Sequence, residues 1–247
     1  MKMSAIRGRI ARRVLVNVRI RPDVLQKILP PMFKPRLIDG WAIGGICFIA
    51  LEQLRMPFLP AEIGLHSLNS AHRFAVYTTD ENGIEKDFVY IARRDTDSTF
   101  SIMVGKHCFP AEHSKAKFEV EDLGHHINVN IDSADHLADL RFTASVAATV
   151  QPNSVFKTVD ELSEFFHRRP IGYSPRRKTD SLDGVRLETD TWEGIPLHVE
   201  KFESSFYGNK ELFPDGSLEI DSAYLMRDIN HYWHKEPTLA AKNCKAC

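Results

Sequence analysis

Cysteine is scarce in this sequence, and no run of apolar residues reaches the length that a membrane-spanning helix needs. The 247 residues contain four cysteines, which are too few and too unevenly spaced for the disulfide framework of a small secreted domain. The basic stretch at residues 1–13 is not followed by the apolar segment of a signal peptide. We therefore expect a cytoplasmic protein with no membrane partner.

An excess of charge of either sign is also missing. Lysine and arginine number 32, aspartate and glutamate number 33, and the formal net charge is -1. Nucleic-acid binding depends on positive charge that neutralises the phosphate backbone, so we expect no nucleic-acid partner. Hydrophobic residues make up 43% of the chain and charged residues 26%, as in an ordinary globular protein. Composition thus favours a folded domain and leaves its function open.

Alternation of apolar and polar residues predicts that most of the chain forms β-strands. Side chains on a strand point to opposite faces in turn, so a period of two marks a strand with one buried face. The first segment shows this with its valines on one face and Asn17 and Arg19 on the other. Gly44 and Gly45 in an apolar segment predict a bulge or a close backbone approach. The expected strands are 14–21, 41–51, 69–79, 85–92, 115–121, 127–132, 140–150, 185–192, 197–202 and 218–227.

Helical spacing of apolar residues predicts three short helices, over 22–29, 98–106 and 158–169. The third has the clearest start, because Thr158 and Glu161 form a capping box. No linker divides the chain. The polar segment 171–184 is nearest to a boundary, but the strands on its two sides could belong to one sheet.

The domain organisation expected is one domain over residues 1–236, followed by a polar tail over 237–247. Cys244 and Cys247 form a C-x-x-C in this tail, outside the strand-to-helix setting in which such a pair serves as a redox site. A frayed terminus and a redox or metal pair are both open interpretations.

Three segments in order carry a resemblance to a known family: residues 69–73 (Asn-Ser-Ala-His-Arg), residues 90–98 (Tyr-Ile-Ala-Arg-Arg-Asp-Thr-Asp-Ser) and residues 220–228. With residues 13–31, they resemble a domain-of-unknown-function family within the acetoacetate decarboxylase-like superfamily. The resemblance implies a mainly β (α+β) fold: an antiparallel β-barrel, closed or nearly closed, with a few peripheral helices and a ligand cavity inside.

The resembling decarboxylases carry two adjacent lysines after a Gly-Tyr-Pro-like turn, one of which forms a Schiff base with the substrate. Here the comparable turn is residues 108–110, and Ala111 and Glu112 follow it. The nucleophilic lysine is therefore absent at this position. Other lysines lie nearby in the sequence, but an amine becomes an activated nucleophile only when it is buried or crowded by charge. These are Lys106, Lys115 and Lys117.

Arg93 and Arg94 follow an apolar strand, where guanidinium groups could hold a carboxylate or phosphate that enters the cavity. The alternative is structural. Asp95, Asp97 and Ser98 would cap the expected helix, and the two arginines would pair with the aspartates. The two interpretations can both hold, and both arginines are candidate substrate-binding residues.

Strict alternation over residues 69–79 places Arg73 and Tyr77 on one face of the strand and His72 on the other. Arg73 and Tyr77 are therefore candidates to line the cavity together and bind substrate. The alternative is that Arg73 faces solvent, as arginines on strands usually do. His72 is then expected in the outer layer as a hydrogen-bonded core histidine.

Glu112 and His113 stand next to the position of the missing lysines, so they are the candidate catalytic acid and base. They could equally be ordinary polar residues of a loop. The eleven histidines show no zinc-ligand spacing, and we predict no metal and no cofactor.

The function expected from these observations is binding of a small organic acid or carbonyl compound, most reasonably an anion, in an internal cavity. The protein could be a lyase-type enzyme without a Schiff-base lysine. The alternative is a non-enzymatic ligand-binding or interaction module, because a fold does not fix a function. A homo-oligomer is the expected form in either case.

Overall fold

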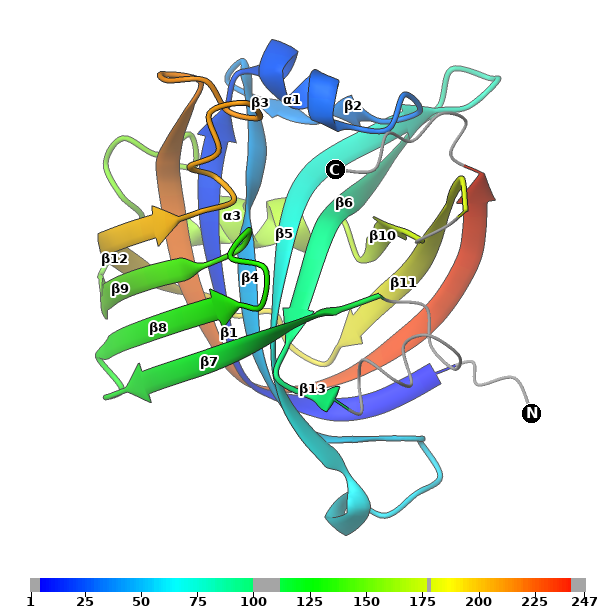
Figure 1. Cartoon of the computed structure of the whole chain (residues 1–247), viewed down its shortest axis with the longest axis vertical. Coiled ribbons are helices and arrows are strands. Elements are labelled where there is room, and N and C mark those ends of the chain that lie inside the picture. Colours follow the sequence, from blue (N-terminus) through cyan, green and yellow to red (C-terminus); the bar gives the residue numbers. More distant parts are fainter. Residues whose placement is uncertain (1–4, 100–111, 177–178, 241–247) are drawn as a thin grey trace.

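The computed structural model of the chain describes residues 5–99, 112–176 and 179–240 and shows a mainly β fold (Figure 1). The first half contains α1 (Pro22–Ile28), the 3-10 helix η1 (Ala61–Ile63) and the strands β1 (Ala5–Ile20), β2 (Lys34–Pro35), β3 (Leu37–Ile38), β4 (Trp41–Arg55), β5 (Leu65–Thr79) and β6 (Glu85–Thr96). The second half contains α3 (Val159–His167) and the strands β7 (Ser114–Asp122), β8 (His126–Ser133), β9 (Leu140–Val146), β10 (Ile171–Pro175), β11 (Ser181–Thr189), β12 (Ile195–Ser204) and β13 (Leu218–Ala240).

The strands form one sheet that closes into a barrel, which confirms the predicted architecture. The nine-stranded ring runs β6-β7-β8-β9-β12-β13-β1-β4-β5 and returns to β6. A second closure exists because β10 pairs with β6 and β11 pairs with β13. The resulting seven-stranded ring consists of β6, β10, β11, β13, β1, β4 and β5. All pairings are antiparallel except β6 with β7 and β6 with β10.

Five strands, β13, β1, β4, β5 and β6, belong to both rings and therefore form a wall between them. Figure 1 shows β5 and β6 between β7–β9 on one side and β10 and β11 on the other. This position changes the burial of β1. Val14, Leu15, Val16 and Asn17 are all buried, so both faces of the strand are covered. The expectation of a single buried face was wrong here because a second layer of strands and α3 cover the other face.

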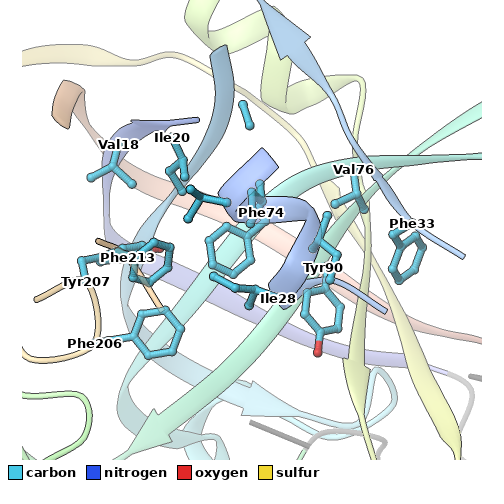
Figure 2. Close-up of a cluster of buried hydrophobic side chains, with 14 of the residues drawn as sticks. Val18, Ile20, Ile28, Phe33, Phe74, Val76, Tyr90, Phe206, Tyr207 and Phe213 are labelled. Carbon is cyan, nitrogen blue, oxygen red and sulfur yellow. The ribbon is translucent and has the colours of Figure 1, made fainter. Parts of the chain in front are cut away.

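An aromatic cluster packs below α1 against one face of the wall (Figure 2). We call this the even-numbered face, because it carries even-numbered residues of β1 and β5 such as Val18, Phe74 and Val76, and we call the other the odd-numbered face. Phe74 lies at its centre, with its ring centroid 6.4 Å from that of Phe206 and 6.5 Å from that of Phe213. The close approach predicted for the paired glycines is confirmed. A Cβ on Gly44 would stand 2.7 Å from the Phe74 ring, and one on Gly45 would stand 2.1 Å from a backbone oxygen of β1. Glycine thus leaves room for the Phe74 ring at position 44 and lets the backbones of β4 and β1 approach closely at position 45.

Helix α3 covers the odd-numbered face of the wall. The predicted N-cap is confirmed, because the Thr158 hydroxyl accepts from the Glu161 amide at 3.1 Å. The Glu161 carboxylate accepts from the amide of Lys157, one residue before the N-cap, at 2.8 Å. Leu162 and Phe166 are buried in one cluster with residues of β1, β4 and β13. The helix therefore places Phe166 against the inner surface of the seven-stranded ring.

Two segments differ from their predicted structure. Residues 171–184, expected to be a polar connection, contribute β10 and the start of β11, which complete the seven-stranded ring. Strand β13 continues to Ala240, which pairs with Ser181, so residues 237–240 of the predicted tail belong to the sheet. The predicted helix at 98–106 lies mostly outside the described residues, as do Cys108, Cys244 and Cys247. Within the described ranges, no helix has the length and hydropathy to cross a bilayer.

Candidate functional site

A cavity of about 180 Å³ lies inside the seven-stranded ring, and every strand of that ring contributes to its lining. Most of the lining is apolar. Ile49, Val89, Ile91, Val185 and Leu187 supply aliphatic surface, and Phe166, Trp192 and Trp233 supply aromatic surface. The polar groups are concentrated at a few arginines and at single Cys and His residues. An apolar cavity with a few convergent polar groups is the usual form of a small-molecule site.

Arg13 and Arg73 are buried cations of this cavity, with 8% and 4% of their surface exposed. Arg13 lies on β1 with its guanidinium 4.6 Å from the centre of the Trp192 ring. Its Nε donates to the Cys47 sulfur at 3.4 Å, and its Nη1 has no hydrogen-bond partner. The stacked indole holds the guanidinium in place without neutralising it.

Arg73 enters the same cavity from β5. Its Nη2 donates to Asn17 Oδ1 at 2.7 Å, and its guanidinium lies 4.0 Å from the centre of the Phe166 ring. Asn17 in turn donates to Ser222 at 3.1 Å, so the acceptor that positions Arg73 is itself fixed. The Nε and Nη1 atoms of Arg73 have no partner. Burial lowers the pKa of Arg73, and the positive charge of Arg13 lowers it further.

No aspartate or glutamate is found among the described residues that line the cavity. Within the same residues, neither Arg13 nor Arg73 forms a salt bridge. Buried cations in proteins are normally paired with a carboxylate, because removing a charge from water costs several kcal/mol unless a counter-charge compensates. Two buried guanidinium groups without a counter-charge therefore form a site of high positive potential.

Cys47 lies between these two arginines on β4. Its strand neighbours in register are Leu15 on β1 and Ala71 on β5. Arg13 is two residues from Leu15, and Arg73 is two residues from Ala71, so the two guanidinium groups approach Cys47 from opposite strands. The thiol is 3% exposed and lines the cavity.

Two more arginines line the cavity and have partners. Arg94 donates to the Ser174 hydroxyl, and burial lowers its pKa to about 10 although Asp183 opposes the shift. Arg169 forms a salt bridge with Asp87 at 2.9 Å, and burial likewise lowers its pKa to about 10. Both remain protonated at neutral pH, so they add to the positive potential of the cavity.

Three of the six predicted site residues line the cavity: Arg73, Arg94 and His113. Tyr77 does not. Its ring lies under the Arg36 guanidinium, 4.1 Å from the ring centre, and Arg36 pairs with Asp87 and Glu85. Glu112 is half-buried and is not among the lining residues. The catalytic role predicted for Glu112 and His113 stays a prediction.

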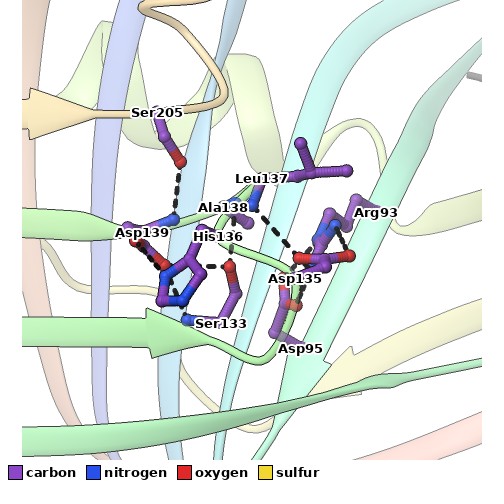
Figure 3. Close-up of polar contacts among 9 residues, drawn as sticks. All are labelled: Arg93, Asp95, Ser133, Asp135, His136, Leu137, Ala138, Asp139 and Ser205. Carbon is purple, nitrogen blue, oxygen red and sulfur yellow. Dashed lines mark hydrogen bonds and ion pairs between the residues drawn. The ribbon is translucent and has the colours of Figure 1, made fainter.

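Arg93 lies on the opposite face of β6, away from the cavity lining (Figure 3). It donates to Asp95 at 2.7 Å and to Asp135 at 2.8 Å, so its guanidinium is engaged by two carboxylates. Asp95 is fully buried. This arrangement matches the structural alternative, in which the arginine pairs with Asp95. Arg93 thus links β6 to the turn after β8.

His72 is buried on the face of β5 opposite Arg73, as the alternation predicted, but it packs in the aromatic core cluster, 4.3 Å from the Phe206 ring centre, and not in an outer layer. It is not hydrogen-bonded, however: neither ring nitrogen has a partner. Burial, assisted by the charge of Arg93, lowers the pKa of His72 to about 3.

The two described lysines near the position of the missing Schiff-base lysine also have contacts. Lys115 donates to the backbone oxygen of Asp97, and Lys117 pairs with Glu119 at 2.6 Å. Neither lines the cavity. Among the described His, Cys, Asp and Glu side chains, no group of three could hold a metal ion.

Sequence reasoning missed Arg13, Cys47 and Trp192. Arg13 precedes the alternating valines and falls on the face of β1 that was assigned to polar residues. Cys47 lies in a segment so uniformly apolar that the alternation gives no orientation. The available signal was the phase of β1: Arg13, Leu15 and Asn17 share a face, and a leucine there indicates that this face is not simply solvated.

A family model for DUF2071, described as "Uncharacterized conserved protein", matches residues 8–220. The chain belongs to this family. A search of the curated proteins finds no match. The family assignment agrees with the resemblance seen in the sequence.

Solved structures with the same fold include acetoacetate decarboxylase from Legionella pneumophila subsp. pneumophila str. Philadelphia 1, at 14% identity and a TM-score of 0.61, with 96% of this chain and 89% of that chain covered. An acetoacetate decarboxylase-like enzyme from Sphingomonas wittichii RW1 is similar at 15% identity and 0.60, with 97% and 93% covered. The enduracididine biosynthesis enzyme MppR, solved in complex with pyruvate, is similar at 11% identity and 0.59, with 96% and 90% covered. At these identities the comparison shows the fold alone.

Proposed function

We propose that this protein binds a small organic acid in the cavity of the seven-stranded ring, with the carboxylate of the ligand held by Arg13 and Arg73. The observation that carries the proposal is the pair of buried guanidinium groups with unpartnered nitrogens and no salt bridge in the described part of the chain. Such groups gain most from a ligand that supplies the missing negative charge.

A carboxylate suits the geometry of the two arginines. Its two oxygens accept several N–H donors, and charge-assisted hydrogen bonds are about twice as strong as neutral ones. Arg73 offers Nε and Nη1, and Arg13 offers Nη1. Stacking on Phe166 and Trp192 fixes both guanidinium planes before the ligand arrives, so little side-chain entropy is lost on binding.

The size and polarity of the cavity limit the rest of the ligand. A cavity of about 150 Å³ in another protein accepts benzene, so about 180 Å³ accommodates a monocyclic or short-chain acid. Val185, Ile91 and Leu187 offer only apolar contacts, which favours one charged end and an apolar remainder. The pyruvate in the MppR complex is a ligand of this chemical class, bound by that protein.

His113 supports a second candidate function, a lyase-type reaction without an imine. Its side chain lines the cavity, where it could move a proton to or from the bound acid. Glu112 is the adjacent carboxylate. In the alternative, the protein binds the acid without transforming it. Product analysis with the bound acid separates the two, since only the lyase depletes it.

The setting proposed for this function is the reducing cytoplasm, which would keep the buried Cys47 as a free thiol. Self-association is proposed as well. It is supported by exposed apolar side chains between β4 and β5, where Phe58 is 67% exposed and Ile63 is 58% exposed.

The test compares acids with their uncharged amides. Titration calorimetry with benzoate and benzamide, and with propionate and propionamide, measures what the carboxylate contributes. We expect acids to bind at least ~10-fold more tightly than amides. Arg73→Met should weaken acid binding by about 1.5–3 kcal/mol, or roughly 10- to 150-fold, with little effect on the amides.

The matched control is Arg21→Met, because Arg21 is exposed and pairs with Asp23 on the surface. This variant should bind both acids as the parent does. Equal affinity of the parent for acids and amides, or equal acid affinity of the parent and Arg73→Met, would refute carboxylate binding by the buried arginines.

A further inference from the structure

We propose that Cys47 is the nucleophile of this cavity and forms a reversible covalent bond with the carbonyl carbon of a bound 2-oxo acid. The inference rests on the proposed function for the placement of the carboxylate, and it goes beyond binding by assigning a reactive atom. Its basis is the position of the thiol between two buried, unpartnered arginines inside a ligand-sized cavity.

Cys47 is held at a fixed place in the lining. It stands near the middle of β4, a strand of fifteen residues that is paired on both sides with β1 and β5. Its neighbour Ala71 also lines the cavity and carries only a methyl group, so the space beside the sulfur is not filled from that side. A rigid position next to open space is what an attacking atom requires.

Two cations lie next to the Cys47 sulfur. The attacking species is the thiolate, and neighbouring cations stabilise it. Arg13 Nε donates to the sulfur at 3.4 Å. Arg73 interacts with the sulfur electrostatically: burial lowers the pKa of Arg73, and Cys47 is the strongest of the neighbours that raise it. No described lining residue is acidic, so the charged groups that line the cavity around the sulfur are guanidinium groups.

Cys47 is also the sole lining residue, among those that the structure describes, with a thiol, hydroxyl or amine side chain. The other polar lining residues are arginines, His113, Trp192 and Trp233, and guanidinium groups stay protonated at neutral pH. Lys115 and Lys117 are engaged elsewhere. Covalent addition by a thiol, hydroxyl or amine of a described lining residue therefore falls to Cys47.

The step is a simple addition. The Cys47 thiol loses its proton, its sulfur forms a bond to the carbonyl carbon, and the carbonyl π bond breaks. The electron pair of that bond passes to the oxygen, which takes up one proton. The product is a thiohemiketal, nothing is oxidised or reduced, and reversal returns the 2-oxo acid. During the step the carboxylate stays on Arg73 and Arg13, which brings the adjacent carbonyl carbon to the sulfur.

The experiment uses two alkylating reagents that differ in charge, iodoacetate and iodoacetamide. Each replaces iodide with a carbon–sulfur bond at a thiolate, so the difference between their rates reports attraction of the carboxylate. Rates at Cys47 are followed by peptide mapping of the full-length protein, which separates Cys47 from the other three cysteines. Glutathione serves as the reference thiol.

We expect the ratio of the iodoacetate rate to the iodoacetamide rate to be at least ~10-fold higher at Cys47 than at glutathione. Arg73→Met should remove this preference, and Arg21→Met should keep it. Millimolar pyruvate should slow alkylation of Cys47 reversibly, and removal of pyruvate by dialysis should restore the rate. Propionate, which lacks the carbonyl, should protect less than pyruvate.

Three outcomes would overturn the inference: a Cys47 inert to both reagents in the folded protein, a rate ratio equal to that of glutathione, or equal protection by pyruvate and propionate. A borohydride-stable pyruvate adduct on a lysine would also overturn it, since a thiohemiketal leaves no such adduct.

Cys47→Ser separates this inference from the proposed function. If benzoate binds that variant as tightly as the parent while the parent thiol is inert, only the nucleophile assignment fails. If benzoate binding ignores Arg73→Met, the proposed function fails regardless of thiol reactivity. Should Cys47→Ser misfold, Cys47→Ala provides the same comparison.

Discussion

Replacing Arg93 with alanine should destabilise the protein and leave carboxylate binding unchanged. Arg93 is 14% exposed and forms hydrogen bonds to the fully buried Asp95 and to Asp135 (Figure 3). Its removal leaves the Asp95 carboxylate buried without its cation. Asp135 is 46% exposed, so water compensates for most of what it loses.

The magnitude follows from the burial of Asp95. Breaking a buried ion pair by removing one partner costs about 3–5 kcal/mol. Unfolding entropies of about 2.1 cal/mol/K per residue give about 0.5 kcal/mol/K for a chain of 247 residues. The expected fall in Tm is therefore about 6–10 °C. Arg93→Ala combined with Asp95→Asn should recover a large part of it, because the uncompensated charge is gone.

The loss should also depend on pH with a defined sign. Burial raises the pKa of Asp95, while its hydrogen bonds to Arg93 oppose that rise. Without Arg93 the pKa rises further, so the folded variant binds more protons than the unfolded chain above about pH 4. The stability of Arg93→Ala, relative to the parent, should accordingly fall as the pH rises from 5 to 7.

Urea unfolding followed by circular dichroism at pH 5 and pH 7 measures both effects, and calorimetric titration with benzoate measures binding. A loss below 1 kcal/mol at pH 7, or an equal loss at both pH values, would refute the assignment of Arg93 to this network. Weaker benzoate binding by a stably folded Arg93→Ala would restore the anion clamp that the sequence suggested for Arg93.

Two further predictions concern stability. His72→Phe should make the protein less sensitive to acid. The pKa of His72 in the folded parent, about 3, lies below the usual 6.5, so its contribution to the stability of the parent is full above pH 6.5 and falls by about 2 kcal/mol from pH 7 to pH 5. Urea unfolding of parent and variant measures this difference. Equal acid sensitivity of both proteins would contradict it. Deleting residues 237–247 should cost about 2 kcal/mol more than deleting 241–247, because Leu239 pairs with the buried Leu182. Equal Tm values for the two truncations would contradict this.

The strands and their approximate bounds could be predicted from the sequence because most of them have one polar face. The alternating β7, β8 and β9 are examples, and the resemblance supplied the barrel that local patterns cannot define. The N-cap of α3 was equally legible, since Thr158 and Glu161 act within one turn. These features depend on contacts between residues close in the sequence or on a repeated pattern.

The cavity and the burial of Arg13 could not be predicted because both depend on the closure of the seven-stranded ring. That closure pairs Ser181 with Ala240, two segments that showed weak strand signals and were assigned to a connection and a tail. Without it, the odd-numbered face of β1 has no reason to be buried, and Arg13 looks like a solvated arginine. Arg73 was a candidate for the cavity because its strand alternates clearly, with a solvent-facing position as the alternative.

The wall shared by the two rings also sets how freely its residues can vary. In β7–β9, alternate positions face solvent and should accept many substitutions, so a map of tolerated changes would repeat every second residue. In the middle of β1, every position from Val14 to Asn17 meets packed side chains on one face or the other. We expect that stretch to tolerate change at no position, so the map of tolerated substitutions should lose its two-residue period in the middle of β1.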